Sequence, residues 1–149
     1  MFNLPLEMVY YVLSYLSYQD IIALEKAFPE LEEQVYDMKL KKGKQKVGEL
    51  NAEMQMMKVK FRKRERELHY YIEMGVCYFH FKSATLRVYR TLSKIMKLKR
   101  KKQEIEAELF IEDHENNEEL VLKCYLCHTL FPSFKLANSH LRDLSEYCQ

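Results

Sequence analysis

The chain has 149 residues, enough for one ordinary domain or two to three small modules, and a hydrophobic content of 48% excludes a disordered chain. Three glycines and three prolines leave little material for turns, and no alternating strand pattern covers most of the length, so we expect a mainly α-helical protein. The sequence has no run of about 18 apolar residues, so we expect no membrane-spanning helix.

The net charge of +2 hides three segments of alternating sign. Counting Lys and Arg against Asp and Glu, residues 1–38 carry −6, residues 39–103 carry +15 and residues 104–149 carry −7. This acid–base–acid order predicts three functional parts. The first residues do not have the pattern of a secretory signal, so we expect the nucleus or cytoplasm, where four cysteines are more typical of a metal site than of disulfides.

Residues 1–42 have the pattern of short helices. Pro5 followed by Glu7 is a favourable helix start, and Ser17 with Asp20 three residues later resembles a capping box for a second helix. Pro29 ends that second helix or opens a third, which we expect to reach about Lys42. A unit of this size buries little surface, so from the pattern alone its apolar side chains are covered either by a partner or by the middle of the same chain.

The order of residues in this segment resembles an F-box over about the first 28 positions. It runs through Leu4-Pro5-Leu6-Glu7, then Val12-Leu13-Ser14-Tyr15-Leu16-Ser17, then Asp20-Ile21-Ile22-Ala23-Leu24. The resemblance implies a surface that docks a Skp-type adaptor of a cullin–RING ubiquitin ligase. The residues that it assigns to this surface are Leu4, Pro5, Val12, Leu13, Leu16, Ile21 and Leu24. Many F-boxes continue with a basic residue and Trp, whereas this chain continues with Phe28 and Pro29.

Residues 43–112 predict long amphipathic or coiled-coil helices. Apolar side chains follow a 4-3 spacing for about three heptads, and a second run follows at helical spacings. The first run is Leu50, Met54, Met57, Phe61, Leu68 and Tyr71, and the second is Leu86, Tyr89, Leu92, Ile95 or Met96, Ile105 and Leu109. The two runs either fold back near residues 75–83, which we favour, or form one continuous helix. Self-association through the coiled coil is a third, weaker hypothesis for what this region does.

The basic side chains of this region allow two interpretations. A stretch with a charge of +15 attracts phosphate, so the basic helices could bind nucleic acid. We favour a solvated helix flank, because charge clustering alone does not read bases. His69, Cys77 and His80 have no partners at metal-ligand spacing, so we expect structural roles for them. Residues 113–119 follow a run of acids and predict a linker.

Residues 120–149 hold three of the four cysteines. Cys124 and Cys127 are two residues apart, His140 follows after twelve residues, and Cys148 after seven more. A two-residue gap allows two thiolates to bind one ion from a tight turn, while His140 and Cys148 approach from a helix and its end. We expect a hairpin over residues 125–131 and a helix capped by Ser133. The pattern resembles a Cys-Cys-His-Cys variant of the ββα zinc finger, with a structural Zn²⁺.

Three other readings of the cysteines are weaker. Cys124-x-x-Cys127-His128 fits haem attachment, but that chemistry is typical of exported proteins. A thioredoxin-like pair needs a βαβ setting, which the sequence lacks. A catalytic zinc keeps an open position, whereas four ready ligands favour a closed site.

Nothing in the sequence predicts a catalytic site, because no nucleophile–base pair, phosphate-binding glycine loop or paired carboxylates can be recognised. We therefore expect a non-enzymatic adaptor. The F-box resemblance implies a recruitment subunit that binds a Skp-type adaptor through residues 1–42 and an unknown target protein through the helical region and finger. The alternative is a nucleic-acid-binding zinc-finger protein. In that case Ser133, Phe134, Lys135 and Asn138 would stand early in the finger's helix.

Overall fold

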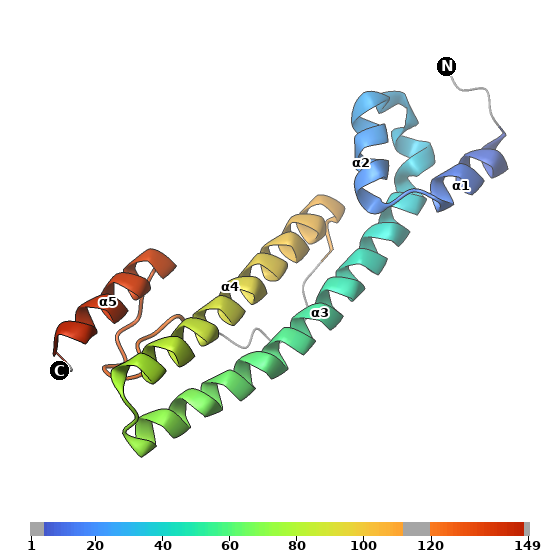
Figure 1. Cartoon of the computed structure of the whole chain (residues 1–149). Helices are drawn as coiled ribbons and strands as arrows, with labels where there is room; N and C mark the ends of the chain where they lie inside the picture. Colours follow the sequence, from blue (N-terminus) through green and yellow to red (C-terminus); the bar gives the residue numbers. More distant parts are fainter. Residues whose placement is uncertain (1–4, 112–119, 148–149) are drawn as a thin grey trace. The chain divides into compact units, whose positions relative to one another are not determined.

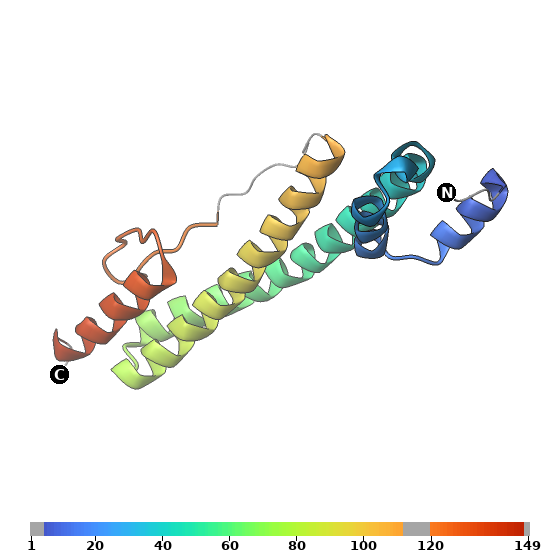
Figure 2. The same cartoon turned by 90° about the horizontal axis from the view of Figure 1, so that it is seen from above.

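The computed structural model describes residues 5–111 and 120–147, and these are mainly helical, as predicted (Figures 1 and 2). The helices, with one 3₁₀ turn, are α1 Leu6–Ser14, α2 Tyr18–Ala27, the turn Pro29–Leu31, α3 Glu32–Met74, α4 Tyr78–Leu109 and α5 Phe134–Tyr147. The only β-type pairing in the described residues is one antiparallel bridge between Lys123 and Leu130. None of the described helices combines the length and the apolarity needed to cross a lipid bilayer.

The chain divides into two compact units. Unit 1 holds the described residues up to Ala52 together with those from Lys101 to Ile111, and unit 2 holds Glu53–Arg100 together with the described residues from Leu120 onward. The long helices α3 and α4 each contribute to both units. The predicted boundary between residues 42 and 43 falls inside α3, and the predicted linker at 113–119 lies outside the described residues.

Unit 1 is organised by short helices around a small core. Pro5 precedes the first residue of α1, and Ser17 caps α2: the Asp20 amide donates to Ser17 Oγ at 3.2 Å, and the Ser17 amide donates to the Asp20 carboxylate at 3.3 Å. The predicted capping box is therefore confirmed. The fully buried side chains of this core are Leu13, Ile21 and Val35.

Gly43 lies within α3 and does not interrupt it. A Cβ at this position would collide with Leu109 of α4 and lie 3.2 Å from Tyr18 of α2. The absent side chain thus allows α3 and α4 to approach closely within unit 1. Helix interiors disfavour glycine by about 1 kcal/mol relative to alanine. This close approach explains why a glycine stands where the sequence suggested the end of a helix.

Unit 2 is an antiparallel helical hairpin, the arrangement that we favoured. α3 ends at Met74, Gly75 adopts a φ of +64°, and α4 begins at Tyr78. A positive φ costs glycine little, so Gly75 suits the reversal. Most of the predicted seam residues of this unit are buried in one core, which contains Phe61 and Leu68 of α3 and Phe81, Val88, Tyr89, Leu92 and Ile95 of α4.

Candidate metal centre

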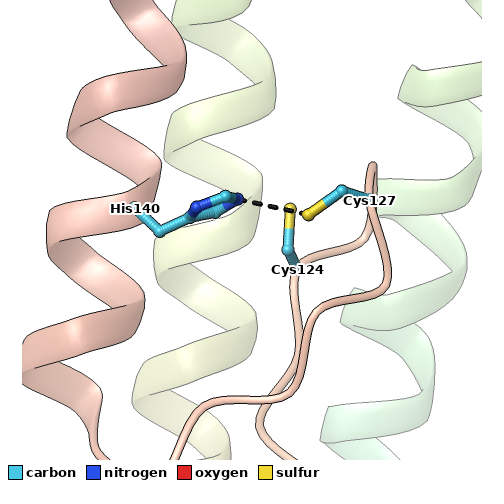
Figure 3. Close-up of side chains that lie close together, drawn as sticks. All are labelled: Cys124, Cys127 and His140. Atoms are coloured by element: carbon cyan, nitrogen blue, oxygen red, sulfur yellow. Dashed lines mark hydrogen bonds between the residues drawn. The ribbon is translucent and has the colours of Figure 1, made fainter.

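Three of the four predicted metal ligands lie together in unit 2 (Figure 3). One ligand atom from each of Cys124, Cys127 and His140 falls within 4.8 Å of the other two. Cys127 Sγ lies 3.3 Å from His140 Nε2. Cys124 is buried, His140 half-buried and Cys127 exposed. The three side chains are close enough to hold one metal ion, while Cys148 lies outside the described residues.

The two cysteines stand on a tight turn that backbone hydrogen bonds close. The Cys124 amide donates to the Thr129 carbonyl at 2.9 Å, and the His128 amide donates to the Cys124 carbonyl at 2.9 Å. His128 has a φ of +61°, which turns the chain back after Cys127. The hairpin predicted over residues 125–131 is reduced to the bridge between Lys123 and Leu130, so a ββα finger is not shown.

Helix α5 brings the imidazole to the sulfurs. Ser133 Oγ accepts a hydrogen bond from the Leu136 amide at 3.3 Å, which is the predicted cap of this helix. One turn apart on α5, Ala137 and Leu141 are buried in the core of unit 2. This packing directs His140 toward the turn, where its ring centroid lies 5.1 Å from that of Phe131. Phe131 therefore packs against the candidate ligand His140.

Tyrosines attach the centre to the helical hairpin. The Tyr89 hydroxyl of α4 donates to the Lys123 carbonyl at 2.9 Å, the Tyr125 hydroxyl donates to the Glu65 carboxylate of α3 at 2.7 Å, and the Tyr78 hydroxyl donates to the Leu141 carbonyl. Sequence analysis missed these attachments, because helical spacing marks Tyr89 as buried without showing what its hydroxyl contacts. The segment from Leu120 onward is thus part of unit 2 rather than a free-standing finger.

The surroundings of the two thiols differ in their electrostatic effect. The side-chain hydrogen bond with Thr129, followed by the Thr129 amide, lowers the pKa of Cys127 to about 7. Burial is the main cause that raises the pKa of Cys124. Metal ions bind cysteine as thiolate, and a metal's own charge favours that form. Two sulfurs and an imidazole form a donor set that suits soft or borderline metals better than Mg²⁺ or Ca²⁺.

The residues assigned to the docking surface by the F-box resemblance occupy different environments. Leu13 and Ile21 are fully buried in the core of unit 1, and Leu16 and Leu24 are half-buried against it. Pro5 and Val12 are exposed, and Leu4 lies outside the described residues. Leu13 and Ile21 are thus covered by their own chain, and the docking role of the whole set stays a prediction. These two residues lie on the inner face of their helices, and the motif alone does not distinguish this face from the outer one.

The outer face of α1, continued by its C-cap residue Tyr15, carries an apolar stripe of which the motif selected only Val12. Met8, Tyr11, Val12 and Tyr15 follow the i, i+3, i+4, i+7 spacing of one helix face. Their exposed fractions are 54%, 64%, 52% and 73%, respectively. We call these four residues the outer stripe. Its signal was present in the sequence, because Met8, Val12 and Tyr15 each stand one position before an inner residue, and Tyr11 completes the helical spacing.

Comparisons of the chain with protein-family models, with curated proteins and with solved structures find no match. What the protein does is therefore inferred from its own residues and their geometry.

Proposed function

We propose that this protein is a non-enzymatic adaptor that docks a Skp-type adaptor of a cullin–RING ubiquitin ligase through the outer stripe of α1 and holds a target protein through unit 2. The observation that carries the proposal is the outer stripe itself, because each of its four large apolar side chains is more than half exposed. Contiguous exposed apolar patches on soluble domains mark interaction sites. The F-box resemblance of residues 4–24 supplies the identity of the partner.

The aromatic members of the outer stripe are ordered by contacts with each other. The rings of Tyr11 and Tyr15 pack edge to face with centroids 5.1 Å apart, and the Tyr15 hydroxyl donates to the Tyr11 hydroxyl at 3.0 Å. Tyrosine is enriched at protein interfaces because it combines a rigid apolar ring with a polar tip. A pre-ordered pair loses less conformational freedom on binding than two free side chains. These contacts support a protein-binding role for α1.

Gel filtration of the full chain mixed with a Skp-type adaptor tests the docking proposal. We expect a stable complex with the wild type and loss of that complex with Tyr11→Glu, which places a charge in the middle of the stripe. Tyr36→Glu is the matched control, because Tyr36 is 57% exposed on α3 of the same unit and lies outside the stripe. Equal loss in both variants, or no complex with the wild type, contradicts the proposal.

For unit 2 we propose a structural zinc ion held by Cys124, Cys127 and His140, with Cys148 as the fourth ligand. Zinc prefers four-coordinate sites of Cys and His, and a closed set of four protein ligands leaves no position for substrate. The zinc would join the turn at Cys124 to helix α5 and stabilise both against the hairpin. This gives unit 2 a fixed surface for a target.

Metal analysis of the purified protein tests the zinc proposal. We expect an equimolar amount of zinc in the wild type and its loss in His140→Ala. His69→Ala is the control, because His69 is exposed on α3 and packs edge to face on Tyr125 without belonging to the ligand set. A metal-free wild type, or full zinc retention in His140→Ala, contradicts the proposed ligands.

A second candidate function is nucleic-acid binding. A shallow groove of about 460 Å³ on α3 is lined by Lys63, Arg66, Glu67, Tyr70 and Tyr71, which combines basic and aromatic side chains. Basic grooves with stacking aromatics are typical of single-strand binding. Fluorescence anisotropy with labelled single- and double-stranded oligonucleotides distinguishes this function. It requires salt-dependent binding that Arg66→Glu weakens, and no binding at low salt excludes it.

A further inference from the structure

The turn between α3 and α4 carries a cysteine–histidine pair that is separate from the metal centre. Cys77 directly precedes α4, and its carbonyl accepts hydrogen bonds from the amides of His80 and Phe81 at 3.1 and 3.2 Å. Its Sγ lies 3.0 Å from His80 Nδ1. Both side chains are exposed. The i, i+3 spacing of Cys77 and His80 at the start of a helix brings a nucleophile and a base together. Sequence analysis considered these residues only as metal ligands and therefore missed the pair.

The environment of Cys77 favours its thiolate form. The hydrogen bond with the His80 side chain is the largest cause that lowers the pKa of Cys77, and the His80 amide adds to it. A helix N-terminus also stabilises negative charge, since its free amides point at the capping side chain. The thiolate is the nucleophilic form of cysteine.

A pocket lies beside Cys77. Its volume is about 340 Å³, and Cys77 itself forms part of its wall. The apolar part of the wall comes from Ile72 of α3, Val76 of the turn, Phe81 of α4 and Leu126 of the metal-binding turn. The titratable groups that line it with Cys77 are the phenols of Tyr71 on α3 and Tyr78 on α4. The His80 ring contacts the rings of Tyr71 and Phe79 edge to face, with centroids 6.5 and 6.0 Å away.

We propose that Cys77 is a modification site, with His80 as its base, at which small disulfides with an apolar or aromatic body exchange while that body enters the pocket. His80 Nδ1 accepts the Cys77 proton, and the thiolate attacks one sulfur of the disulfide. The S–S bond of the reagent breaks, a mixed disulfide forms at Cys77, and the other half leaves as a thiolate that takes up a proton. The disulfide is the only oxidant required.

The test uses the full chain loaded with zinc and the neutral aromatic disulfide 4,4′-dithiodipyridine. Stopped-flow absorbance measures the rate, and peptide mapping by mass spectrometry identifies the modified cysteine. We expect Cys77 to react first and faster than N-acetylcysteine at neutral pH, with zinc retained. His80→Asn should slow the reaction severalfold at neutral pH, because the thiol loses the base that accepts its proton and a smaller fraction is thiolate. His69→Asn is the control, because His69 is on α3 and does not line the pocket.

Two results overturn the proposal. The first is a Cys77 that reacts no faster than N-acetylcysteine, or whose rate His80→Asn leaves unchanged while circular dichroism shows a folded chain. The second result concerns the pocket. With each rate divided by the rate for N-acetylcysteine and the same reagent, Cys77 should react more slowly with oxidised glutathione, which is polar and charged, than with the aromatic disulfide. Equal relative rates for the two disulfides would contradict a role of the pocket in the reaction.

Discussion

Units 1 and 2 are built from the same two long helices and differ in how much they bury. Unit 2 surrounds a continuous core to which α3, α4, α5 and the segment around Cys124 all contribute. Unit 1 has a core of three fully buried side chains and relies on polar contacts around it. Lys39 Nζ lies 3.1 Å from the Glu25 carboxylate, and Lys42 Nζ donates to the Ser14 carbonyl at 2.9 Å. Both units leave large apolar side chains exposed, but in unit 1 four of them, Met8, Tyr11, Val12 and Tyr15, follow one helix face. The comparison teaches that the small core of unit 1 leaves an ordered apolar face of α1 uncovered.

Truncating the core of unit 2 should have the largest effect on stability. Phe61 is 2% exposed in the large core, so Phe61→Ala should lower the free energy of unfolding by about 3–5 kcal/mol. Val35→Ala in the core of unit 1 removes fewer atoms and should cost about half as much or less. Urea denaturation followed by circular dichroism measures both. A larger loss from Val35→Ala would reverse the comparison between the units.

The two glycines inside α3 give a sharper test of packing in unit 1. A Cβ at Gly43 meets Leu109 and Tyr18, whereas a Cβ at Gly48 meets nothing within 4 Å. Gly48→Ala should therefore stabilise the protein by about 0.5–1 kcal/mol through helix propensity. Gly43→Ala should destabilise it by about 1–2 kcal/mol, because Leu109 must move. Thermal unfolding of both variants checks the signs, and stabilisation by Gly43→Ala would contradict the close approach.

These glycines also show which features of the fold could not be predicted from the sequence. The heptad spacing predicted the helical seam, and Ser17 with Asp20 predicted a cap, because both signals are local and depend on helix geometry alone. The role of Gly43 depends on Leu109, which lies far away in the sequence, so local pattern indicated a boundary instead of a contact. The fold class was therefore predictable, whereas the positions at which long helices touch were not.

The same limit applies to the two sites. The spacing of Cys124, Cys127 and His140 predicted that they meet, because the chemistry of one ion fixes both residue type and gap. The attachment of this centre by Tyr89 and Tyr125 could not be predicted, since a hydroxyl partner depends on tertiary packing. On α1, the motif selected Leu13 although the chain itself buries it, because an amphipathic helix with two apolar faces gives no local sign of which face is inner.

Removing the cap of α2 should have a moderate effect that is centred on unit 1. Ser17→Ala leaves the Asp20 amide without its acceptor and should cost about 1 kcal/mol. Hydrogen exchange should show faster opening in α2 than in α5, because the cap contacts only unit 1. Ser133→Ala is the matched change in unit 2, where the cap of α5 is lost instead. Equal acceleration of both helices in the Ser17 variant would contradict a local effect.

The smallest effect at neutral pH is expected from Tyr18→Phe, whose consequence appears under alkaline conditions. Burial is the main cause that raises the pKa of Tyr18 above its ordinary value, and the nearby Glu108 carboxylate, which accepts its hydroxyl at 3.1 Å, adds to the shift. A raised folded-state pKa means that the unfolded chain loses this proton first as pH rises. The stabilisation is therefore fully present below the ordinary tyrosine pKa of about 10 and is lost as pH rises above it.

Urea denaturation at a series of pH values up to about 11 measures this loss. The free energy of unfolding should decline more steeply with pH for the wild type than for Tyr18→Phe, because the variant has no phenol to ionise there. Parallel declines would show that Tyr18 ionises as freely in unit 1 as in the unfolded chain, and that the folded unit does not exclude water from this hydroxyl.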